Sequence, residues 1–75
     1  MDEQIFRIRP YTKRELARLY FPDTPKIKTA VTNLRRWMGQ NAGMMERLSE
    51  AGYLPGNRIF SPRQVRIIVE AFGEP

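Results

Sequence analysis

Two prolines, Pro22 and Pro25, separate two stretches in the first half of the chain that otherwise have the pattern of helices. Proline disfavours helical backbone at the residue before it, so Pro22 should end a helix no later than Phe21. Thr24 followed by Pro25 is typical of an N-cap and a first helical position. We therefore predict one helix before this segment, a sharp turn, and a second helix from Pro25.

The first helix has a clear start signal. Thr12 and Glu15 have the spacing of a capping box, in which the two side chains satisfy free backbone N–H groups. We predict a helix from about Lys13 to Tyr20. Its inner face should be formed by Leu16, Ala17, Leu19 and Tyr20.

The second helix, predicted over residues 25–38, has two distinct faces. Apolar residues recur every three or four positions, which predicts a buried stripe of Ile27, Ala30, Val31, Leu34 and Met38, with Trp37 at its edge and packed on the core. Polar residues occupy the opposite side: Lys28, Thr29, Thr32 and Arg36, flanked by Asn33 and Arg35.

Strand signals lie at the start of the chain and near its last third. Residues 5–9 alternate from Phe6 onward, which predicts a strand with Phe6 and Ile8 facing inward and Pro10 ending it. Residues 53–60 have two apolar arms around a Pro-Gly-Asn turn, which indicates a hairpin. We expect its second arm, residues 58–60, to pair with the strand at residues 5–9.

Two further helices complete the expected architecture. A short third helix should cover Met44 to Leu48 and end before Gly52. The last helix should begin after Ser61, which has proline at the next position and glutamine three residues on. Its inner face should be formed by Val65, Ile68, Val69 and Phe72, with Gly73 closing it. The expected fold is mainly α with a small β-sheet or hairpin, a winged helix-turn-helix-like single domain of about four helices over residues 1–75.

The composition excludes several kinds of chemistry. The sequence contains neither cysteine nor histidine, which removes disulfides, the usual zinc ligands and the usual general base. No nucleophile with a base, paired carboxylates or phosphate-binding glycine loop is evident. We therefore expect no enzymatic activity, cofactor, metal or small-molecule substrate. The acidic start and the lack of a long apolar run predict a cytoplasmic protein that does not enter a membrane.

Positive charge is concentrated in one part of the chain. Residues 7–36 contain nine basic and two acidic residues, whereas the whole chain has a formal charge of +5. This asymmetry is typical of a protein that contacts phosphates from one side, and double-stranded DNA is the expected partner. In the predicted interface, arginines and lysines hold the backbone, the second helix reads bases, and the hairpin acts as a wing. The candidate residues are Arg7, Arg9, Lys13, Arg14, Arg18, Lys28, Thr29, Thr32, Asn33, Arg35, Arg36 and Arg58.

Other interpretations of the same residues remain open. A polar face opposite an apolar stripe is what any surface helix shows, and a Pro-Gly-Asn turn is usually only a turn. The alternative function is a protein interaction adaptor or a homodimerisation module. Its apolar surface would consist of Trp37, Met38, Met44, Met45 and Tyr53.

Several segments carry a resemblance to a known family. They are Lys13 to Ala17, Phe21 to Asp23, Leu34 to Trp37, Phe60 to Val65 and Phe72 to Pro75. In these segments, and over nearly its full length, the chain resembles small uncharacterised proteins of anaerobic gut bacteria that are catalogued as a domain of unknown function. That resemblance implies no activity and no site residues.

A more distant resemblance concerns the order of motifs. The matching segments follow one another as in the DNA-binding domains of MerR-type regulators and phage excisionases. They are Tyr11-Thr12, Glu15 to Ala17, Leu34 to Trp37, Gly52-Tyr53, Phe60-Ser61 and Val65. The resemblance implies a recognition helix that ends in a leucine-arginine-aromatic run, followed by a wing. The chain differs from these domains in the bulky turn at Tyr20 to Pro22 and in about ten extra residues before the expected wing.

Overall fold

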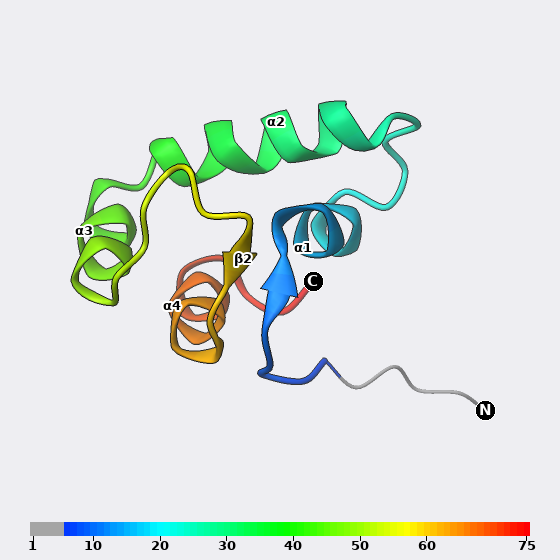
Figure 1. The fold of residues 1–75 in the computed structure, drawn as a ribbon. Helices are drawn as coiled ribbons and strands as arrows, with labels where there is room; N and C mark the ends of the chain where they lie inside the picture. The colour runs from blue at the N-terminus through cyan, green and yellow to red at the C-terminus, as the bar shows by residue number, and fades with distance from the viewer. Residues whose placement is uncertain (1–5) are drawn as a thin grey trace.

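The computed structural model describes residues 6–75, which form four helices and a two-stranded antiparallel sheet (Figure 1). The fold is mainly helical, as expected. In chain order the elements are β1 (Tyr11–Thr12), α1 (Lys13–Tyr20), α2 (Ile27–Gly39), α3 (Ala42–Glu50), β2 (Ile59–Phe60) and α4 (Pro62–Phe72). The long helix α2 lies across the top of the molecule in Figure 1, with α1 beneath one end and α3 at the other.

Helix α1 has the bounds and the cap that the sequence predicts. The backbone N–H of Glu15 donates to Thr12 Oγ1 at 3.0 Å, and Glu15 Oε1 accepts from the Thr12 N–H at 2.8 Å. Leu16 and Ala17 are fully buried, whereas Leu19 is 39 % exposed.

The start of α2 differs from the prediction. The helix begins at Ile27, and its N-cap is Lys26 with no side-chain cap, not Thr24. Thr24 belongs to the preceding turn, where its N–H donates to the Phe21 carbonyl at 3.3 Å and its own carbonyl accepts from the Arg18 guanidinium. Because Thr24 is held in this turn, the chain needs two more residues before it becomes helical.

The sheet is not where the sequence predicts it. Tyr11 pairs with Phe60 and Thr12 with Ile59, whereas residues 6–9 form no strand and Ile8 is 39 % exposed. The expected β-hairpin over residues 53–60 is also wrong, because only its second arm is a strand. The Lys13 N–H donates to the Arg58 carbonyl at 2.9 Å, so the start of α1 determines where β2 pairs. Ile5, at the start of the predicted strand, lies outside the described residues.

The last two helices lie where the sequence predicts them, and the predicted cap of α4 is confirmed. Helix α3 is longer than predicted, and Gly52 follows it with a φ of 87°, in the left-handed region that favours glycine. Helix α4 begins with proline after the Ser61 cap, and Gln64 completes the capping box. Among residues 6–75, no helix has the length and apolar character needed to cross a membrane.

The core is formed by side chains from every element. Its members include Leu16, Leu34, Leu48, Phe60, Val65 and Ile68, all of them at most 1 % exposed. Trp37 packs against this core as expected and stacks on Phe72, with ring centroids 3.8 Å apart. Tyr20 and Phe21 contact the Trp37 ring edge-on.

This packing removes most of the apolar surface that the adaptor interpretation requires. Met38, Met44 and Tyr53 are buried, with 2 %, 3 % and 7 % exposure, and belong to the core. Trp37 and Met45 are only partly accessible. The predicted exposure of Met38, Met44 and Tyr53 is therefore wrong, because all three belong to the core.

Candidate nucleic-acid interface

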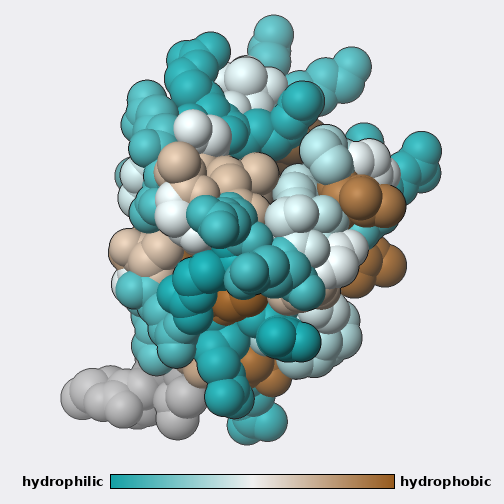
Figure 2. Space-filling model, turned by 90° about the vertical axis from the view of Figure 1, so that its left-hand side faces the viewer, coloured by the Kyte–Doolittle hydropathy of each residue, from teal (hydrophilic) through white to brown (hydrophobic). Residues whose placement is uncertain are grey.

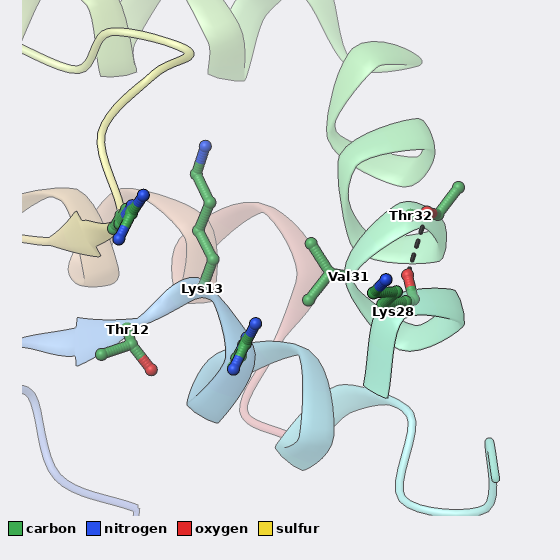
Figure 3. A pocket seen from close by; sticks show the side chains of 7 residues that line it. Thr12, Lys13, Lys28, Val31 and Thr32 are labelled. Atoms are coloured by element: carbon green, nitrogen blue, oxygen red, sulfur yellow. Dashed lines mark hydrogen bonds between the residues drawn. The ribbon is translucent and has the colours of Figure 1, made fainter. Parts of the chain in front are cut away.

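A hollow of about 680 Å³ lies between α1, α2 and the loop before β2. Figure 3 shows its walls, with Lys13 between the loop on one side and Val31 of α2 on the other. The described residues that line it include four basic side chains and no acidic one. The full lining is Thr12, Lys13, Arg14, Lys28, Val31, Thr32 and Arg58.

The basic side chains of the hollow come from three separate segments. Lys13 and Arg14 open α1, Lys28 lies in the first turn of α2, and Arg58 precedes β2. The capping box fixes the start of α1, and the pairing of β2 with β1 brings Arg58 beside it. The fold therefore assembles a concentration of positive charge that no local sequence motif contains.

Lys13 connects the start of α1 to the loop before β2, which forms one side of the hollow. Its Nζ donates to the Pro55 carbonyl at 2.6 Å and lies 5.3 Å from the centre of the Tyr53 ring. Lys13 is accordingly less exposed than Arg14, Lys28 and Arg58. These contacts hold the loop over residues 54–58 against the start of α1. Within residues 6–75, the side chains of the other three cations, Arg14, Lys28 and Arg58, are exposed on the lining of the hollow.

The outer face of α2 continues from the rim of this hollow. Its exposed polar residues are Lys28, Thr29, Thr32, Arg35 and Arg36, with Asn33 partly exposed. The helix contains no acidic residue. The Thr32 hydroxyl donates to the Lys28 carbonyl at 3.0 Å, which turns the hydroxyl toward the helix backbone (Figure 3). Thr32 therefore offers a methyl group more readily than a hydrogen bond.

A second, shallower hollow of about 200 Å³ lies farther along α2. It is lined by Phe21, Asn33, Arg36, Trp37 and Gln40. Asn33, Arg36 and Gln40 lie along one side of the helix, because residues three and four apart share a face. Gln40 was missed by the sequence analysis, although its spacing from Arg36 and Asn33 would have indicated it.

Three of the predicted basic residues lie elsewhere. Arg18 is engaged in the turn between α1 and α2, where its guanidinium donates to the carbonyls of Thr24 and Pro22. Arg7 and Arg9 belong to the segment before β1, which Figure 1 shows on the side of the sheet away from α2. Arg9 lies over the Tyr11 ring at 3.9 Å and donates to the Pro10 carbonyl. The structure does not bring these three residues to the hollow.

The face formed by α3 and α4 has a different electrostatic character. Arg47 and Glu70 form an ion pair of 2.6 Å, and both side chains are about half exposed. A hollow of about 430 Å³ beside them is lined by Glu50 as well as by Arg63 and Arg66. In Figure 2, which shows this side, hydrophilic side chains dominate with a few hydrophobic ones between them. Its mixed charges make it a poorer surface for a polyanion.

The described residues contain no group of three or more acidic, histidine or cysteine side chains that could hold a metal ion. The buried side-chain nitrogen and oxygen atoms of these residues all have hydrogen-bond partners. The exposed arginine and lysine side chains of the hollow and the α2 face are groups that can bind an anion.

Comparison with known proteins identifies the family. No curated protein and no solved structure matches the chain. One family model does match, over residues 7–75. The match includes α1 to α4 and both strands. The chain therefore belongs to the family described as "Domain of unknown function (DUF4248)".

Proposed function

We propose that this protein binds double-stranded DNA through α2 and the adjoining basic hollow, as a small transcriptional or mobile-element accessory regulator. The observation that carries the proposal is the surface made by the outer face of α2 and the hollow beside it, in which the described residues include cations and no carboxylate. In this proposal α1, its turn and α2 act as a helix-turn-helix, and the loop before β2 takes the place of a wing.

The hollow suits a phosphate of the DNA backbone. Arg14, Lys28 and Arg58 are exposed on its lining and come from different segments, so they surround the space and do not form one flat row. Arginine and lysine in such positions fix the register of a protein on the duplex. With about three phosphates neutralised by these three side chains, log affinity should fall with log salt at a slope of roughly −2.5 to −3.

The outer face of α2 suits the major groove. A groove about 12 Å wide admits one helix, and the side chains that reach base edges must be exposed and polar. Arg36 can bridge the two acceptors of guanine, Asn33 can pair with adenine, and Thr29 can contact a thymine methyl group. The burial of Ala30 and Leu34 on the opposite side keeps this face outward.

The proposal is tested by fluorescence anisotropy of a labelled duplex of about 20 base pairs, two turns of DNA. The titration is repeated between about 50 mM and about 200 mM salt with the wild type, Arg36→Ala and Arg66→Ala. Arg66 is the matched control, because it is an exposed arginine on α4 that lines the α3–α4 hollow.

We expect micromolar binding that weakens steeply with salt, a clear loss in Arg36→Ala and no change in Arg66→Ala. A bidentate base contact contributes about 1 to 3 kcal/mol on its preferred sequence, and less on a random one. Absence of binding at low salt, or equal losses in the two variants, would contradict the proposal.

A further inference from the structure

The loop before β2 and the first residue of that strand expose two large apolar side chains. Leu54 is 65 % exposed and Ile59 is 56 % exposed, the two highest values among the large hydrophobic residues that the structure describes. Pro55 and Gly56 lie between them and are also exposed. A single exposed leucine is ordinary on a protein surface, so the meaning of this pair depends on how the loop is held and what lies beside it.

The loop has a well-anchored base. Tyr53 and Phe60, on either side of it, are buried and stacked with ring centroids 5.5 Å apart. Within the loop the Asn57 N–H donates to the Leu54 carbonyl at 2.9 Å, and Lys13 Nζ donates to the Pro55 carbonyl. Leu54 is therefore presented to solvent by a loop that is tied to the core, to itself and to α1.

The loop and α2 lie on opposite sides of the basic hollow (Figure 3). The sugar-phosphate backbone of DNA is the ridge that separates the major groove from the minor groove. If this ridge occupies the hollow, the two walls of the hollow fall in neighbouring grooves. With α2 in the major groove, the loop faces the minor groove.

We propose that the loop over residues 54–58 enters the minor groove and that Leu54, together with Ile59 at the start of β2, packs as an apolar wedge against the floor of that groove. This inference rests on the proposed function and adds to it a second segment of the protein that contacts the DNA bases. Minor-groove proteins combine arginine or lysine with wedges of leucine, isoleucine or proline, and the pair here is flanked by Arg58 and Lys13. The positive charges of Arg58 and Lys13 beside the loop favour DNA over a protein as its partner.

The test uses the same anisotropy titration with an A·T-rich duplex and two variants, Leu54→Ser and Leu19→Ser. Leu19 is the matched control, because it is an exposed leucine at the far end of α1 from the hollow. A second arm repeats the wild-type titration with the duplex saturated by netropsin, a small molecule that fills the minor groove. This arm needs no variant and so does not depend on how a substitution affects folding.

We expect Leu54→Ser to bind about tenfold more weakly, which corresponds to about 1.4 kcal/mol. Its salt slope should equal that of the wild type, because an apolar contact releases no counterions. Leu19→Ser should bind like the wild type, and netropsin should weaken wild-type binding by a similar factor.

Unchanged affinity in Leu54→Ser, or unchanged wild-type affinity with netropsin present, overturns the inference and leaves the proposed function in place. Absence of wild-type binding to the duplex at low salt overturns both. The two failures are thus distinguished by the wild-type titration alone.

Discussion

Tyr20 connects the end of α1 to the segment after α4. Its hydroxyl donates to the Gly73 carbonyl at 2.6 Å, and its ring contacts Trp37 and Phe72 edge-on. Burial, and after it the negative charge of Glu74, raises the pKa of the Tyr20 phenol from its ordinary value of 10.0 to about 12. At this residue, one side chain couples the α1–α2 pair to the last helix.

The raised pKa of Tyr20 makes stability depend on alkaline pH. Below pH 10 the phenol is protonated in both states, so its contribution is fully present. Between pH 10 and about 12 the unfolded chain loses this proton while the folded chain retains it, and the free energy of unfolding falls. We expect this loss to be smaller in Tyr20→Phe than in the wild type.

Urea unfolding followed by Trp37 fluorescence, at pH 7 and at several values between 10 and 12, measures this difference. At pH 7 the variant should be less stable by about 1 kcal/mol, because it lacks the hydrogen bond to Gly73. The same alkaline loss in both proteins would show that Tyr20 does not titrate as described.

Among the helices and strands, the capping box of α4 also connects two helices. Ser61 Oγ accepts from the Gln64 N–H, Gln64 Oε1 accepts from the Ser61 N–H, and Gln64 Nε2 donates to the Ala51 carbonyl. This buried glutamine therefore ties the start of α4 to the end of α3.

We expect Ser61→Ala to lower the free energy of unfolding by about 1 kcal/mol, since it removes an N-cap acceptor. Ser49→Ala, at an exposed position in α3, is the control and should cause no loss. Thermal or urea unfolding of both variants measures the comparison. Equal stability of the two variants would show that the cap contributes nothing.

The sequence could predict where two of the helices begin, but not how the strands pair. Caps are local, so Thr12 with Glu15 and Ser61 with Gln64 indicated the starts of α1 and α4 correctly. A strand needs a partner, and alternation at residues 6–9 says nothing about where that partner lies. Because the Lys13 N–H holds the Arg58 carbonyl, β2 pairs with residues 11–12 and the predicted strand is left without a partner.

The candidate site could be predicted only in part, for a related reason. The face of α2 follows from helical periodicity, and the structure places Thr29, Thr32 and Arg36 on its exposed side. The roles of Arg18 and Lys13 depend on carbonyls of the turn and the loop, whose positions no sequence pattern gives. The burial of Tyr53 and Met44 likewise depends on contacts between distant elements.

At the scale of the whole molecule, two faces differ in charge. The surface formed by α2 and the basic hollow has cations and no lining carboxylate among the described residues, whereas the α3–α4 surface mixes Arg47, Arg63 and Arg66 with Glu50 and Glu70. We propose that DNA binds the first face and not the second.

Backbone amide NMR spectra of the isotope-labelled protein, recorded during titration with the duplex, test this claim most directly because they show which face is contacted. We predict the largest shift changes at Lys28, Thr32 and Arg58, around the hollow, with the amides of Arg63 and Arg66 unaffected. Spectra that do not change with DNA, or changes centred on α3 and α4, would show that DNA does not bind the α2 face.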